Sequence, residues 1–112
     1  MESTSPLRCG FLTKCGHVRK NWKRRWFVLL ADGTLAYSEV DGKPFKGSLN
    51  VGSSTCIALP DSQYKRGHVF SIASKHGESL VIQADSDHDR DDWVRYVLRT
   101  IYVFRKHKTK YF

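Results

Sequence analysis

Basic residues are concentrated in the first third of the chain, and they are the strongest candidates for chemistry. The stretch KNWKRRWFVL at residues 20–29 places four cations within six residues and then becomes aromatic and aliphatic. No acidic residue lies between Glu2 and Asp32. Lysine and arginine donate hydrogen bonds to phosphates, so this segment could bind nucleic acid, direct the chain to the nucleus or contact a phosphate-rich surface.

The overall composition limits what kind of protein this can be. The 112 residues carry a formal charge of +8, with 40% apolar and 27% charged residues, which suits one soluble domain. No apolar run approaches the roughly 20 residues of a membrane span, and the N-terminus has no signal-peptide pattern. The three cysteines lack disulfide or zinc-ligand spacing, so we expect a cytoplasmic protein without a metal or other cofactor.

A helix is predicted near the C-terminal end, where the spacing of apolar residues changes. From Trp93 to Phe104 these residues recur at intervals of three and four, the pattern of an amphipathic helix. Ser86 is a suitable N-cap, and aspartates in the first turn complement the helix dipole. The aspartates concerned are Asp85, Asp87, Asp89, Asp91 and Asp92. We therefore interpret this acidic cluster as structural rather than as a metal site.

Short β-type runs separated by turn residues precede this helix. We expect strands at 7–15, 23–31, 34–40, 46–51, 55–59, 68–74 and 79–84. The Asp-Gly pair at 32–33 and the segment SKHGES at 74–79 are typical of hairpin turns. The apolar stripe of the helix needs a partner, and seven short strands can supply one by curling into a barrel or sandwich whose open end the helix closes. The predicted fold is mainly β, a seven-stranded bent antiparallel barrel or sandwich capped by a C-terminal α-helix.

Side-chain alternation along three of these strands predicts a cluster at one end of the barrel. If Leu12, Phe27 and Leu35 point into the core, the next residues on the same faces meet at the barrel mouth. We call this cluster the cationic cup, and its members are Lys14, Lys23, Arg25 and Tyr37. A charge on a core-side face is costly unless it meets an anion or water, so an anionic ligand is expected. Solvated cations on an exposed strand end are the simpler alternative.

Other functions fit the residues less well. Nucleic-acid binding would need aromatic platforms on an exposed sheet face, whereas alternation assigns Phe27 to the core and Tyr37 to the cup. A localisation signal would need a flexible peptide, but the basic run lies in a predicted strand. The five histidines are scattered and no G-x-S-x-G or phosphate-loop motif occurs, so we expect neither catalysis nor a nucleic-acid partner.

These features resemble the pleckstrin homology family. The segment CGFLTKCGHVRKNWKRRWFVLLADGTLAYSEV at 9–40 and Trp93 in the helix DRDDWVRYVL carry the resemblance, which covers about residues 7–104. It implies a bent seven-stranded sheet with a capping helix. It also implies binding of a phosphoinositide headgroup, with 3-phosphorylated lipids preferred, and recruitment to the cytoplasmic face of an anionic membrane. The alternative is a protein-interaction module that binds anionic lipids only weakly.

The resemblance also implies which residues contact the lipid. Family members that bind 3-phosphorylated lipids carry a lysine ending strand one and a basic-x-Arg pattern on strand two, matched here by Lys14, Lys23 and Arg25. The complete set of predicted headgroup contacts is Lys14, Lys20, Lys23, Arg25, Tyr37 and Lys46. The predicted membrane-facing residues are Val18, Arg19, Trp22 and Arg24. For the tryptophan, packing beside its strand is the alternative to insertion.

The resemblance separates the domain from its flanking segments. Residues 1–6 are expected to be a disordered N-terminus, 7–104 the pleckstrin homology domain and 105–112 a basic tail. The tail could continue the helix, form a linker or contact the membrane, and the sequence leaves these alternatives open. We expect the domain to be monomeric.

Overall fold

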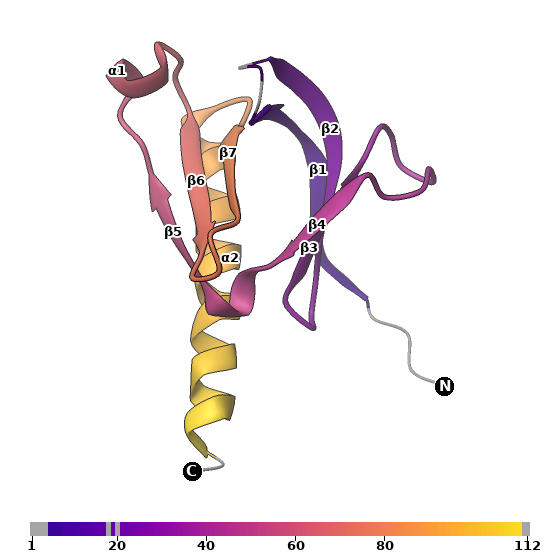
Figure 1. Cartoon of the computed structure of the whole chain (residues 1–112), viewed down its shortest axis with the longest axis vertical. Coiled ribbons are helices and arrows are strands. Elements are labelled where there is room, and N and C mark those ends of the chain that lie inside the picture. The colour runs from indigo at the N-terminus through magenta and orange to yellow at the C-terminus, as the bar shows by residue number, and fades with distance from the viewer. Residues whose placement is uncertain (1–4, 18, 20, 111–112) are drawn as a thin grey trace.

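Seven antiparallel strands form one curved sheet, and a long C-terminal helix packs against it (Figure 1). The structure is a computed structural model, and it describes residues 5–17, 19 and 21–110. The strands are β1 (Pro6–Cys15), β2 (Trp22–Leu30), β3 (Thr34–Ser38), β4 (Gly47–Asn50), β5 (Ser54–Ala58), β6 (Val69–Ser74) and β7 (Ser79–Gln83). The helical elements are the 3-10 turn η1 (Val51–Ser53), α1 (Asp61–Tyr64) and α2 (Asp87–Lys110).

The strand order explains how the chain surrounds its core. The order is β4-β3-β2-β1-β7-β6-β5, so β4 and β5 are consecutive in sequence but form opposite edges of the sheet. The two halves join where β1 pairs with β7, through Thr13–Gln83 and Lys14–Ile82. In the described part of the chain, β4 and β5 are not paired, and η1 and α2 cover the space between them. The predicted fold class is therefore confirmed, with a sheet that bends but does not close.

The core lies between the curved sheet and one face of α2. Trp93, Val97 and Ile101 are at most 5% exposed and pack in one cluster with strand residues such as Phe27 and Phe70. Their spacing of four residues places them on one side of the helix, as the sequence pattern predicts. Within the described residues, no helix combines the length and apolar character needed to cross a membrane.

The start of α2 is stabilised by side chains that accept hydrogen bonds. Ser86 Oγ accepts a bond from the backbone N–H of Asp89 at 3.0 Å, which confirms the predicted N-cap. His68 Nδ1 lies 2.6 Å from Asp87 Oδ1, and this hydrogen bond holds the pKa of Asp87 below its usual value. The aspartates of this region therefore have structural roles.

The structure differs from the predicted elements in a few places. Residue 51 begins η1 instead of ending a strand, because the Asn50 side chain accepts a 2.8 Å bond from the N–H of Gly52 and turns the chain. The sequence does not predict α1, since a four-residue helix is too short to show periodicity. At the other end, α2 continues through 105–110, so helix extension is the alternative that the structure supports for those residues.

The three cysteines are expected to react at very different rates. Cys9 is exposed, whereas Cys15 and Cys56 are buried, and burial raises the pKa of Cys56 to about 12. Because the thiolate is the reactive form, a thiol reagent at about pH 8 should modify Cys9 first in the native protein and all three after denaturation. Above about pH 9 the unfolded state loses the Cys56 proton before the folded state does, so stability should fall as pH rises. Labelling followed by peptide mass spectrometry measures the rates, and equal rates for Cys9 and Cys56 would contradict the burial.

Candidate functional site

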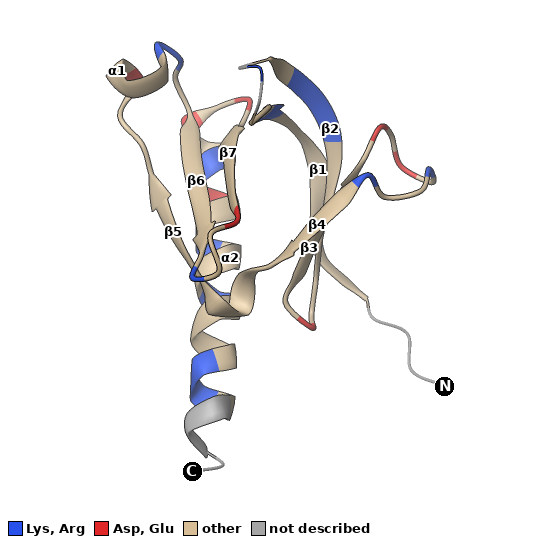
Figure 2. Ribbon diagram, viewed as in Figure 1, with Lys and Arg blue, Asp and Glu red and all other residues tan. Residues whose placement is uncertain are grey.

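A cationic hollow of about 320 Å3 lies at the end of β1, β2 and β3 beside the β1–β2 loop. It brings together five of the predicted headgroup contacts, Lys14, Lys23, Arg25, Tyr37 and Lys46. Lys20, the sixth, lies outside the described residues. The remaining lining residues are Gly16, His17, Arg19 and Asn21. Figure 2 shows the corresponding blue stretch of β2.

Strand register places like charges side by side in this hollow. Lys14 of β1 stands directly opposite Lys23 of β2, while Phe27 pairs with Tyr37 of β3. Like charges directly opposite one another destabilise a sheet. On β2, Phe27 is fully buried, Arg25 is half-buried and Lys23 is exposed, so the face changes from apolar to cationic towards the loop. Repulsion between these cations lowers the stability of the sheet when no ligand is bound, so the arrangement favours binding of an anion.

Tyr37 forms the wall between this hollow and the core. Its ring centroid lies 5.4 Å from that of Phe27, and Lys14 Nζ lies 5.0 Å from the Tyr37 ring centroid. The Tyr37 hydroxyl occupies the space that a Cβ atom at Gly47 would fill. Glycine at this position therefore allows the phenol to reach the hollow.

Replacing Gly47 with alanine is expected to displace the Tyr37 ring. Overpacking of this kind costs about 1 to 3 kcal/mol of stability. Loss of a Tyr37 contact should also weaken anion binding by about fivefold, the value of one hydrogen bond. Gly10→Ala is the matched control, because a Cβ at Gly10 would meet its nearest atom at an ordinary 3.8 Å. Thermal melts and ligand titrations measure both effects, and identical behaviour of the two variants would contradict this role for Gly47.

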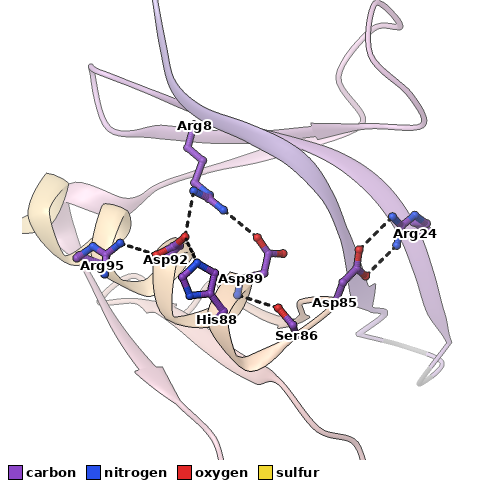
Figure 3. A network of polar contacts seen from close by, with 8 residues as sticks. All are labelled: Arg8, Arg24, Asp85, Ser86, His88, Asp89, Asp92 and Arg95. Atoms are coloured by element: carbon purple, nitrogen blue, oxygen red, sulfur yellow. Dashed lines mark hydrogen bonds and ion pairs between the residues drawn. The ribbon is translucent and has the colours of Figure 1, made fainter.

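Two cations of β1 and β2 that lie outside the hollow have acidic partners from distant parts of the chain. Arg8 lies 2.8 Å from Asp89, and Arg24 lies 3.1 Å from Asp85 (Figure 3). Asp85 follows β7 and Asp89 lies in the first turn of α2, so acidic residues at the start of the helix neutralise one cation on each strand, Arg8 of β1 and Arg24 of β2. The paired residues are far apart along the chain, and they come together only in the folded structure.

Three cations inside the hollow lack such partners in the described part of the chain. Among the described residues, no carboxylate forms an ion pair with Lys14, Lys23 or Arg25, and Arg25 Nη1 donates to the backbone oxygen of Arg24 at 3.0 Å. At the rim, Lys46 Nζ lies 3.9 Å from Glu39 Oε2. The fold therefore separates paired cations from a set that remains available to an anionic ligand.

The predicted membrane-facing residues lie in different environments. Arg19 lines the hollow, whereas Arg24 lies on the opposite face of β2 with its guanidinium 4.9 Å from the Phe11 ring centroid. Trp22 packs edge-on against Tyr64 of α1 at 5.9 Å between ring centroids. The Arg66 guanidinium also lies 4.4 Å from the Trp22 ring centroid. These contacts fit the packing alternative for Trp22, and Val18 lies outside the described residues.

Two loop residues of the hollow were not among the predicted contacts. His17 and Asn21 line it because the β1–β2 loop folds tightly, with the Gly16 N–H donating to the Asn21 backbone oxygen at 2.8 Å. A Cβ at Gly16 would lie 2.7 Å from the Arg19 backbone oxygen, so the loop requires glycine there. The sequence signal that could have identified His17 and Asn21 is their position in the loop between two cationic strand ends. Within the described residues, no three His, Cys, Asp or Glu side chains converge as metal ligands.

A larger hollow of about 800 Å3 lies elsewhere, between η1, β5, β6 and the end of α2. Phe104 of α2 fills the space that a Cβ at Gly52 would occupy, and it lies 2.8 Å from the Cβ position of Gly33. Gly33 has a φ of +92°, which favours glycine independently. We interpret this region as the packing seam that holds the helix end on the sheet.

Comparison with known proteins agrees with this architecture. The sequence model of the PH domain family matches residues 6–102. Rho GTPase-activating protein 22 of Mus musculus is 31% identical over 108 residues, which cover 87% of this chain and 15% of that protein. Pleckstrin of Homo sapiens is 34% identical over 95 residues, which cover 85% of this chain and 27% of pleckstrin. The chain thus spans less than a third of the length of either relative.

Solved structures give the same result. The C-terminal PH domain of pleckstrin in complex with D-myo-Ins(1,2,3,5,6)P5 has a TM-score of 0.80 at 22% identity, covering 89% of this chain and 99% of that chain. At this identity the likeness establishes the fold alone. A solution structure of a pleckstrin homology domain also has a TM-score of 0.80, at 30% identity, covering 95% of this chain and 93% of that chain. Because the family match extends over most of its residues, the chain belongs to the PH domain family.

Proposed function

We propose that the cationic hollow binds the phosphorylated inositol headgroup of a phosphoinositide, with 3-phosphorylated lipids preferred. Binding would recruit the chain to the cytoplasmic face of a membrane. The observation that carries this proposal is the convergence of Lys14, Lys23 and Arg25, which have no carboxylate partner among the described residues. The pleckstrin domain of similar fold was solved with an inositol pentakisphosphate, which supports the same class of ligand here.

Different residues of the hollow would make different contacts with the headgroup. Lys14 and Arg25 lie nearest the core and would hold ring phosphates, with Arg25 able to bind in a bidentate way. Lys23 and Tyr37 would add hydrogen bonds from the neighbouring strands. Further contacts at the rim and towards the membrane are proposed for Lys20, Lys46, Arg19 and Val18, whereas Arg24 pairs with Asp85 and Trp22 packs against Tyr64.

General attraction to a charged surface is too weak to explain specific recruitment. A basic residue near an anionic membrane contributes about 1 kcal/mol, so four or five cations give roughly 4 to 5 kcal/mol. That corresponds to about millimolar affinity, whereas micromolar affinity needs about 8 kcal/mol. Charge-assisted hydrogen bonds to phosphate groups are strong enough to supply the difference.

Vesicle sedimentation tests the proposal directly. Phosphatidylcholine vesicles containing single phosphoinositides are compared with vesicles in which phosphatidylserine supplies the same total charge, at about 0.15 M salt. We expect pelleting with phosphoinositides and competition by the soluble headgroup. Equal pelleting with phosphatidylserine would contradict a pocket and leave surface electrostatics. RNA binding with a steep salt dependence would instead indicate a nucleic-acid partner.

A protein-interaction role is the second candidate, and the outer face of α2 favours it. Leu98, Tyr102 and Val103 are 44%, 61% and 46% exposed on this helix. Exposed apolar residues that gather on one element are typical of interaction surfaces. Absence of lipid binding in the sedimentation experiment would support this role over the headgroup site.

A further inference from the structure

A second hollow of about 230 Å3 adjoins the cationic one and has different chemistry. The two share His17 and Tyr37, so they lie on either side of these residues. The second hollow is completed by β4 and by the β6–β7 turn, through Ser48, Leu49, Gly77, Glu78, Ser79 and Leu80. It therefore extends the site away from β2 and towards β7.

The second hollow offers hydrogen-bonding groups but no Lys or Arg among its described lining residues. Tyr37, Ser48 and Ser79 carry hydroxyls, His17 carries an imidazole and Glu78 carries a carboxylate. Hydroxyl and carboxylate oxygens accept hydrogen bonds from a sugar-like hydroxyl. A carboxylate repels a phosphate, because both groups carry negative charge.

The backbone of Glu78 is held by the hydrogen bonds of the β6–β7 turn. The Ser74 N–H donates to the backbone oxygen of Glu78 at 2.7 Å, and the Gly77 N–H donates to the backbone oxygen of Ser74 at 3.1 Å. The His76 N–H donates to Ser74 Oγ at 3.0 Å, and Gly77 adopts a φ of +93°. The residue therefore belongs to a defined tight turn at the border of the site.

We infer that the second hollow receives an edge of the inositol ring that carries free hydroxyls, and that Glu78 selects against headgroups phosphorylated on that edge. This inference rests on the proposed function, in which the cationic hollow holds the phosphorylated edge. The ligand class is therefore a phosphoinositide headgroup with an incomplete set of ring phosphates. Lys14 and Arg25 supply affinity, and Glu78 supplies discrimination.

Titration calorimetry with soluble headgroups tests the selection. For each variant, the affinity for Ins(1,3,4,5)P4 is divided by that for the best-bound headgroup with one phosphate fewer. Because Glu78 is exposed and its charge is screened, Glu78→Gln should raise this ratio by about fivefold. Glu78→Lys, which replaces the repulsion with attraction, should raise it further. Asp41→Asn is the matched control, since it removes one exposed carboxylate that lines neither hollow.

The outcomes separate this inference from the proposed function. An increased ratio in the Glu78 variants with an unchanged ratio in Asp41→Asn supports the selection. An unchanged ratio in both Glu78 variants, or an equal increase in Asp41→Asn, overturns it. If Arg25→Ala then weakens binding of every headgroup, the cationic hollow still stands as the lipid site. If Arg25→Ala leaves all affinities unchanged, the proposed function itself fails.

Discussion

Replacement of Arg25 by alanine is expected to weaken binding to phosphoinositide vesicles by about 10- to 100-fold, since hydrogen bonds to charged groups contribute about 1.5 to 3 kcal/mol. The side chain lines the cationic hollow from the core-side face of β2, where it can bind a phosphate in a bidentate way. Vesicle sedimentation across a lipid titration measures the change in affinity.

Arg24→Ala is the control for this experiment, because the two residues are neighbours and carry the same charge. Arg24 lies on the other face of β2 and pairs with Asp85 at 3.1 Å, so its loss should change affinity by less than about threefold, as for an exposed charge. Arg25 is half-buried without a carboxylate partner among the described residues, so its replacement should leave the melting temperature nearly unchanged. Equal loss of binding in both variants would show that net charge, rather than the hollow, controls binding.

Trp93→Ala is expected to lower the free energy of unfolding by about 3 to 5 kcal/mol, the usual cost of removing a large buried aromatic side chain. The Trp93 side chain is 1% exposed and belongs to the cluster that joins α2 to the sheet. The Arg8 guanidinium also lies 5.0 Å from its ring centroid. Chemical denaturation monitored by circular dichroism measures the loss.

Tyr102→Ala provides the control on the same helix. This side chain is 61% exposed, so its removal should change stability by no more than about 0.5 kcal/mol. Similar losses in the two variants would contradict the assignment of Trp93 as the anchor of α2. A stable Trp93→Ala protein would contradict it as well.

The members of the cationic cup could be predicted because strand alternation is a local property of the sequence. Lys14 and Tyr37 follow an apolar residue on the same face of their strand, and Arg25 precedes one. The strands β1, β2 and β3 are also consecutive in a meander. Consecutive strands usually pair, so their ends were expected to meet. The helix could be predicted for a similar reason, since the spacing of Trp93, Val97 and Ile101 is visible in one segment.

Features that depend on distant segments could not be predicted. Arg8 and Asp89 are separated by 81 positions and Arg24 and Asp85 by 61, so the sequence shows unpaired cations where the fold has ion pairs. The presence of Glu78 and His17 in the lining of one hollow likewise depends on the pairing of β7 with β1. The open edge between β4 and β5 is a third example, because strand count alone does not determine whether a sheet closes.

The seam between β1 and β7 has a consequence for motions of the native protein. Lys14 pairs with Ile82 through its backbone, and its side chain lines the cationic hollow. A headgroup that holds this side chain would therefore also resist local separation of the two halves of the sheet. By linkage, the energy of that opening rises with ligand occupancy. The amide hydrogens of Ile82 and Gln83 in β7, two residues that line neither hollow, should then exchange more slowly when the site is filled. Exchange at this pair would thus detect binding at backbone that the ligand does not touch.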